Sequence, residues 1–232
     1  MSVNRSQTMK PLLIVDSPFP AVDIVALNAL AGVIVDIDAN AETLAAMARL
    51  AGRTFALLAR VEPLERLSGD VLRRLLESGA DGIVLSGCRG RADIQKLDVM
   101  LRVAEAAHGA APDPIRIYGE YGSSPEGLLS THPLTDSSPR LRALIFNGVA
   151  LAKSIGCQEP TSARHQRIAA PILTGRANVV LRAFEAGVPS YEVLPATPDE
   201  AAARWAQSQS RDNGFASVVC NSIEQATILG RA

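Results

Sequence analysis

The segment Gly82–Gly87, with the sequence GIVLSG, is a short run of aliphatic residues that ends in Ser and Gly. An uninterrupted apolar run of this length is typical of a strand that is buried on both faces of a parallel sheet. Seven more segments have the same character: residues 11–16 (PLLIVD), 32–38 (GVIVDID), 54–61 (TFALLARV), 115–121 (IRIYGEY), 143–148 (ALIFNG), 190–195 (SYEVLP) and 216–221 (ASVVCN). The sequence therefore predicts eight buried strands.

The intervals between these segments indicate how the strands are connected. Successive segments start 21 to 47 residues apart, which leaves room for a helix in each gap. Helical spacing of apolar residues occurs over residues 41–50, 70–78 and 94–106. Eight β/α units in a row predict a parallel (β/α)8 barrel, or TIM barrel, and a doubly wound open sheet is the alternative.

The boundaries of the domain and of one helix follow from local composition. Residues 10–232 are expected to form a single barrel domain, and residues 1–9, which are polar and without period, a flexible tail. Thr197, Pro198 and Glu200 have the pattern of a helix start, with Thr197 as the N-cap, ahead of the Ala-rich stretch EAAARWAQ.

Composition excludes several classes of function. The chain has 23 Lys and Arg against 24 Asp and Glu, a formal net charge of −1, so no strong field attracts nucleic acid or an anionic membrane. No apolar run is long enough to span a bilayer, and MSVNRSQTMK lacks the apolar centre of a signal peptide. A cytoplasmic protein is expected. Cys88, Cys157 and Cys220 form no C-x-x-C pair, which favours free thiols.

Polar side chains occur at the carboxyl ends of the predicted strands, where a barrel places its chemistry. Residues two apart on a strand share a face, so Asp36 and Asp38 are expected to point into one space, as are Arg60 and Glu62. The other candidates are Asp16, Ser86, Cys88, Glu120, Asn147, Glu192 and Asn221. Such a set fits a divalent cation beside an arginine that binds a substrate carboxylate, or a buried ion-pair network that neutralises the barrel mouth.

Other motifs give weaker indications. The segment 86–91 (SGCRGR) fits either an anion site at a helix N-terminus or a solvated loop. No Walker loop, dinucleotide fingerprint or G-x-S-x-G elbow is present. The three histidines fall outside the predicted strand ends, and no histidine neighbours Cys88 or Cys220, which argues against a cysteine nucleophile.

Several segments, in this order, resemble the HpcH/HpaI aldolase and citrate lyase beta-subunit (CitE-like) family. GVIVDID and ALLARVEP look like its second and third strands, GADGIVLSG like its fourth, and LRALIFNGVALAKSIG like its sixth. AFEAGVPSYEV with DNGFASVVCNS resembles the last two units. The resemblance spans most of the chain, as a divergent member, and implies a metal-dependent carbon–carbon lyase on a (β/α)8 barrel.

The resemblance also assigns roles to individual residues. Arg60 matches the arginine that holds a substrate carboxylate or enolate, and Glu120 matches a glutamate ligand of Mg²⁺ or Mn²⁺. The aspartate expected as second ligand falls on Ala150, so Asp36, Asp38 or Asn147 would have to complete the metal site. Ser86-Gly87, Asn221-Ser222 and the loop 17–20 (SPFP) also depart from the family pattern.

Two functions follow from this comparison. The first is a lyase that acts on a small 2-oxo or 3-hydroxy acid or its CoA thioester, with Arg60 and Asp38 catalytic and with Asp36, Ser86 and Asn147 contacting the substrate. The second, motivated by Ala150 and the other departures, is a catalytically degenerate relative that serves as a ligand-binding or interaction subunit without metal. The resemblance implies a homo-oligomer in either case.

Overall fold

The protein is described by a computed structural model over residues 10–15, 24–110, 115–161, 167–197 and 199–230. Eight parallel strands form a closed barrel in chain order, with β1 paired to both β2 and β8. The strands are β1 (Leu12–Val15), β2 (Gly32–Asp36), β3 (Ala56–Val61), β4 (Gly82–Cys88), β5 (Arg116–Tyr121), β6 (Leu141–Phe146), β7 (Ser190–Val193) and β8 (Ser217–Cys220). The predicted TIM barrel is confirmed, and the open sheet is excluded.

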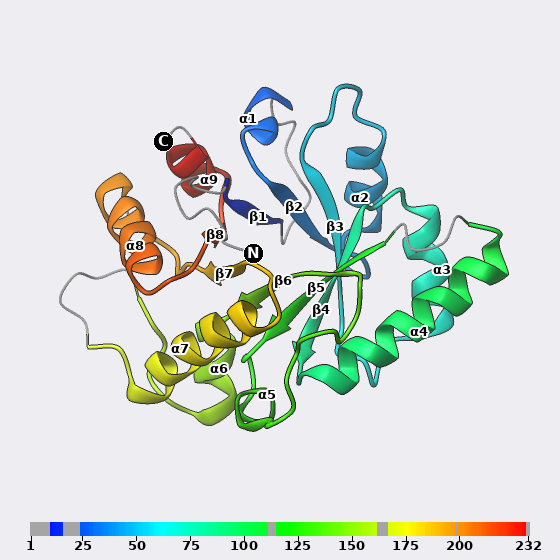
Figure 1. Ribbon diagram of the computed structural model, residues 1–232. Helices are drawn as coiled ribbons and strands as arrows, with labels where there is room; N and C mark the ends of the chain where they lie inside the picture. Colours follow the sequence, from blue (N-terminus) through cyan, green and yellow to red (C-terminus); the bar gives the residue numbers. More distant parts are fainter. Residues whose placement is uncertain (1–9, 16–23, 111–114, 162–166, 198, 231–232) are drawn as a thin grey trace.

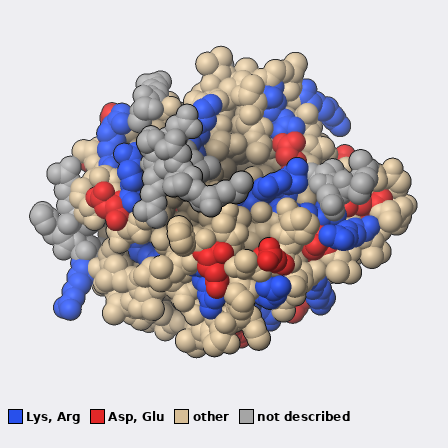
Figure 2. Space-filling model, in the orientation of Figure 1, with Lys and Arg blue, Asp and Glu red and all other residues tan. Residues whose placement is uncertain are grey.

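Helices alternate with the strands and surround the barrel (Figure 1). In the described part of the chain they are α1 (Ile24–Asn28), α2 (Ala41–Ala48), α3 (Gly69–Glu77), α4 (Arg91–His108), α5 (Pro125–Leu129), α6 (Gly148–Ile155), α7 (Ala170–Glu185), α8 (Glu200–Asp212) and α9 (Ile223–Gly230). None of these described helices is long and apolar enough to cross a membrane. On the face in Figure 2, basic and acidic side chains are interspersed, in keeping with the balanced charge.

Alternate residues of each strand face inward and outward. The inward residues form a small buried cluster of Leu12, Ile34, Leu58, Val84, Ala143, Ile145, Tyr191, Val193 and Val219. A larger cluster fills the layer between the strands and the helices. Because side chains alternate with a period of two, the polar residues two positions beyond the inward cluster members also face the barrel axis, at its carboxyl-end mouth.

The start of α8 differs from the expected pattern. Asp199, rather than Thr197, is the N-cap, and its Oδ1 accepts a hydrogen bond from the Ala202 N–H at 2.7 Å. Thr197 instead accepts a hydrogen bond from Gln225 Nε2 at 3.2 Å, which ties the segment after β7 to α9. Asp is as good an N-cap as Thr, and Asp199 directly precedes the first helical residue, so it takes the cap position. Pro198, which was predicted to belong to the helix start, lies outside the described residues.

An arginine with no exposed surface links α4 to the start of β6. Arg140 Nη1 and Nη2 each lie 2.6 Å from one carboxylate oxygen of Glu105, and its Nε lies 2.8 Å from Asp98 Oδ1. Paired N–H groups of a guanidinium match the two oxygens of a carboxylate, which offsets part of the cost of burying both charges. Arg102, largely exposed, binds Asp98 from the solvent side.

Candidate functional site at the barrel mouth

Arg60 and Glu120 meet at the carboxyl ends of β3 and β5, although β4 lies between these strands. Arg60 Nε and Nη2 donate to Glu120 Oε2 at 3.1 and 2.9 Å. The Glu120 side chain is 5% exposed and that of Arg60 is 29% exposed. The carboxylate is therefore held beneath a guanidinium that still reaches solvent at the mouth.

Asn147 fixes the other side of this carboxylate. Its Nδ2 donates to Glu120 Oε1 at 3.1 Å, while its Oδ1 accepts from the Ala150 N–H at 3.0 Å as the N-cap of α6. The backbone N–H decides which way the amide points, because only the oxygen can accept from it. Asn147 was predicted to contact substrate. Its link between Glu120 and α6 was missed, although an Asn directly before a helix is a cap signal.

Asp36 and Asp38 do not converge, which corrects the expectation from sequence. β2 ends at Asp36, whose Oδ1 accepts from the N–H groups of Asp38 and Ala39 at 2.9 and 2.8 Å. This Asx-type turn changes the direction of the chain. The alternation of side chains between the two faces of β2 therefore ends at Asp36. Asp38 is exposed and pairs with Arg74 of α3. Asp36 remains beside Arg60, with which it is in register across β2 and β3.

Arg60 and Glu62 do not share a partner either. Glu62 follows the end of β3 and pairs with the exposed Arg66 at 3.3 Å, outside the mouth. Ser86 is half-buried and stands two residues beyond the inward Val84 of β4, the strand between those of Arg60 and Glu120. The mouth thus brings together Arg60, Glu120 and Asn147, with Asp36 and Ser86 on the two strands beside that of Arg60. Asp16 lies outside the described residues.

The mouth fits a divalent cation poorly. No group of three or more His, Cys, Asp or Glu side chains in the described residues could hold a metal ion. Mg²⁺ demands near-octahedral oxygen ligands, yet both oxygens of Glu120 already accept hydrogen bonds, and Asn147 directs its oxygen to α6. Ala150 adds no ligand. The role predicted for Glu120 as a metal ligand stays a prediction.

Other candidates from the sequence have structural partners. Arg89 Nη2 pairs with Asp93 at 2.9 Å, and Arg91 donates to the carbonyl groups of Pro133 and Thr135 at 3.1 and 2.6 Å. Arg89 and Arg91 therefore bind other groups of the protein itself. Neither the anion-site interpretation nor the solvated-loop interpretation predicted these contacts.

Glu192 does not belong to the mouth. Its neighbours Tyr191 and Val193 face the barrel interior, so Glu192 faces the helices. There it pairs with Arg176 of α7 at 2.8 Å. Burial raises the pKa of the Glu192 carboxyl, and the Arg176 charge opposes that rise. The pair joins α7 to the barrel wall and leaves the mouth to the five residues above.

The cysteines differ sharply in accessibility. Burial raises the pKa of the Cys88 and Cys220 thiols to about 12, whereas Cys157 is half-buried near the end of α6. Because the thiolate is the reactive form, we expect a disulfide reagent at neutral pH to modify only Cys157 rapidly in the folded chain. Absorbance of the released thiol measures this, and unfolding in denaturant should release all three. Rapid modification of a second thiol in the folded protein would contradict the expectation.

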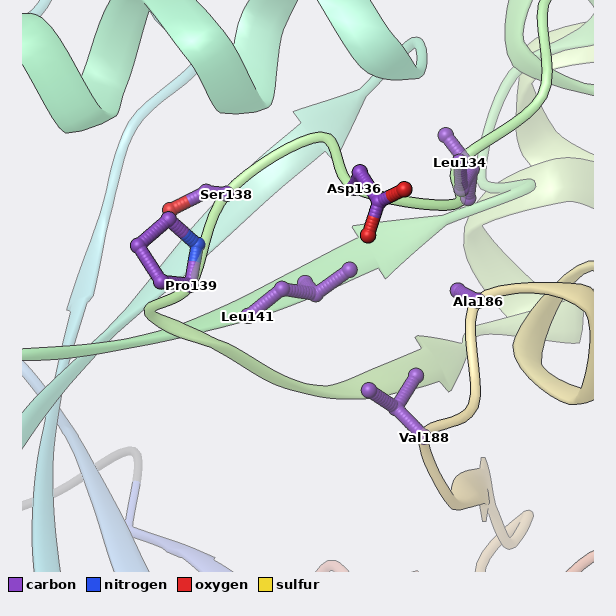
Figure 3. A pocket seen from close by; sticks show the side chains of 7 residues that line it. All are labelled: Leu134, Asp136, Ser138, Pro139, Leu141, Ala186 and Val188. Carbon is purple, nitrogen blue, oxygen red and sulfur yellow. The ribbon is translucent and has the colours of Figure 1, made fainter. Parts of the chain in front are cut away.

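A pocket of about 240 Å³ lies away from the mouth (Figure 3). It is lined by the loop before β6, the first residue of β6 and the segment before β7: Leu134, Asp136, Ser138, Pro139, Leu141, Ala186 and Val188. These residues stand at the amino ends of the strands, opposite to the mouth. With a single titratable side chain, this pocket is a poorer candidate for chemistry than the mouth.

The fold and the mouth define a single-domain (β/α)8 barrel with a buried carboxylate and a partly exposed guanidinium at its carboxyl end. No protein-family model matches the sequence, and no curated protein matches it either. Solved structures do. RipC from Yersinia pestis is 21% identical, with a TM-score of 0.70 over 96% of this chain and 94% of that one.

Two larger proteins have the same fold. A citrate lyase from Burkholderia xenovorans is 14% identical, with a TM-score of 0.75 over 96% of this chain and 76% of that one. A malate synthase from Haloferax volcanii, solved with magnesium and glyoxylate, is 16% identical, with a TM-score of 0.73 over 97% of this chain and 75% of that one. The predicted resemblance to citrate lyase-type barrels is confirmed in the fold.

Proposed function

We propose that this chain binds a small carboxylic acid or its CoA thioester at the barrel mouth and acts there as a carbon–carbon lyase. The observation that carries the proposal is the Arg60 guanidinium, which is anchored on Glu120 and 29% exposed at the carboxyl end of the barrel. Barrels place their chemistry at this end. The likeness in fold to a citrate lyase and a malate synthase adds support for chemistry on small acids.

Arg60 would serve both binding and bond cleavage. In a lyase reaction of this class a hydroxyl loses its proton to a base, a carbonyl forms, the adjacent carbon–carbon bond breaks, and its electron pair moves onto the partner fragment as an enolate. A proton then returns to the enolate carbon. A fixed guanidinium beside the enolate oxygen stabilises the charge that develops there. Asp36, in register with Arg60 on the neighbouring strand β2, is the carboxylate we assign to proton transfer.

The remaining predicted contacts are consistent with this arrangement. Ser86 and Asn147 flank the Arg60–Glu120 pair at the ends of β4 and β6. The catalytic role predicted for Asp38 is left out of the proposal, because its carboxylate is 48% exposed and paired with Arg74. A homo-oligomer stays a prediction, for which the exposed Leu181 and Phe184 on α7 offer an apolar surface.

The proposal is tested by incubating the full chain with 3-hydroxy acids and their CoA thioesters, which carry the hydroxyl that the cleavage needs, and by measuring the binding of pyruvate and oxaloacetate. We expect cleavage of at least one of the hydroxy compounds, measured as the 2-oxo acid or CoA-linked product by chromatography and mass spectrometry. An Asp38→Asn variant should retain this activity, whereas an Asp36→Asn variant should lose most of it. Failure to bind any compound of the panel would overturn the proposal.

A second candidate function is a non-catalytic binding subunit. The specific observation in its favour is Ala150, which places a methyl group where the resemblance expects a carboxylate. This function predicts that a small acid binds at Arg60 and is recovered unchanged after prolonged incubation. Turnover of the bound acid would exclude it.

A further inference from the structure

We propose that the barrel mouth binds its acid without a resident divalent cation, because the guanidinium of Arg60 occupies the carboxylate that a cation would need. This inference rests on the proposed binding of an acid at the mouth and specifies its chemistry. In it, Arg60 touches the acid, while Glu120 and Asn147 are positioning residues. The inference goes against the metal dependence that the family resemblance implies.

The first step concerns the oxygens of Glu120. Oε2 accepts two N–H groups of Arg60, at 3.1 and 2.9 Å, and Oε1 accepts the Asn147 amide at 3.1 Å. The side chain is 5% exposed, so solvent does not compete for these contacts. A cation at Glu120 would have to displace the charge-assisted hydrogen bonds that the Arg60 guanidinium donates. The cation would also be repelled by the positive charge of Arg60 beside it.

The second step concerns what surrounds Glu120. Asn147 Nδ2 lies 3.1 Å from Glu120 Oε1, where a second ligand oxygen would be needed, but it presents N–H groups instead. Its orientation is locked, because Oδ1 caps α6 through the Ala150 N–H. Among the described residues of the mouth, a cation finds Glu120 with both oxygens already bonded, Asp36 with its Oδ1 bonded to two backbone N–H groups, and an amide that presents N–H groups.

The third step concerns the positive charge itself. Arg60 donates to Glu120 through its Nε and Nη2 groups, and the Arg60 side chain as a whole is 29% exposed. A guanidinium presents five N–H donors in a plane, so it can contact more than one acceptor at a time. Glu120 thus orients the guanidinium that contacts the acid in this inference.

The structure also provides a one-atom control. Asn147→Asp replaces the amide nitrogen, 3.1 Å from Glu120 Oε1, with an oxygen, and the other oxygen can still cap α6. Adjacent oxygens of an octahedral Mg²⁺ site lie roughly 3.0 Å apart, given a metal–oxygen distance of about 2.1 Å. The variant therefore has two carboxylate oxygens at the spacing of a cation site.

The first measurement is the depletion of the free Mn²⁺ electron paramagnetic resonance signal by chelator-treated full chain. We expect no depletion by the natural chain at millimolar Mn²⁺, and binding of one ion per chain by Asn147→Asp. Binding of one ion by the natural chain, lost in Glu120→Gln, would overturn the inference.

The second measurement is calorimetric titration of oxaloacetate with excess chelator and, separately, with excess Mg²⁺ over protein and acid. We expect the affinity for oxaloacetate to be the same within about threefold under the two conditions. A larger increase in affinity with Mg²⁺ would overturn the inference. Absence of acid binding under both conditions would refute the proposed function. The Mn²⁺ measurement would still decide whether the mouth holds a cation, so the two failures are distinguishable.

Discussion

Replacement of Arg60 by Ala is expected to weaken the binding of a small carboxylic acid at the mouth by about 100-fold or more. The substitution removes the charged donors that face the opening and leaves Glu120, 5% exposed, without its guanidinium. The acid would then approach an uncompensated negative charge, so attraction changes to repulsion. Calorimetric titration of oxaloacetate measures the loss, and any cleavage activity should fall with it.

Two variants keep this prediction testable. Arg74→Ala removes an arginine of similar exposure that pairs with Asp38 outside the mouth, and it should bind the acid like the natural chain. Arg60→Lys retains the charge that balances Glu120, so it should fold, but a point charge does not reproduce the two-edged guanidinium. We expect it to lose about tenfold in affinity. Unchanged binding in both Arg60 variants would mean that the acid binds elsewhere.

Replacement of Arg140 by Ala is expected to lower the free energy of unfolding by about 3–5 kcal/mol. Arg140 has no exposed surface and holds both oxygens of Glu105 and one of Asp98. Its removal leaves two buried carboxylates of α4 near one another without their shared cation. The expected loss is a large share of the stability of an ordinary domain. Urea denaturation followed by circular dichroism measures it.

The matched control is Arg102→Ala, which removes the other arginine at Asp98. Arg102 is 55% exposed, so its pair contributes less than about 1 kcal/mol, and the variant should unfold close to the natural midpoint. If the two substitutions lowered the free energy of unfolding equally, the contribution of Arg140 to stability would not depend on its burial. If Arg140→Ala fails to accumulate as folded protein, Arg140→Lys, with a single charged donor group, should show an intermediate loss.

The architecture of the barrel could be predicted from sequence because its signals are local. A buried strand such as β4 is an unbroken aliphatic run, and helices such as α4 show apolar residues at their own spacing. Eight such pairs in order leave few ways to bury every strand on both faces. The strand boundaries predicted from sequence also put Arg60, Ser86 and Glu120 within two residues of strand ends, where the structure has them.

The barrel and the residue types at its mouth follow from local sequence patterns, whereas the partners of those residues depend on the folded chain. Arg60 and Glu120 are 60 residues apart and meet across β4, a contact that strand order and tilt create. Asp38 turned away because hydrogen bonds to Asp36 ended β2 two residues early. Hydrophobic spacing records which face of an element is buried, whereas an ion pair depends on where two side chains end in space.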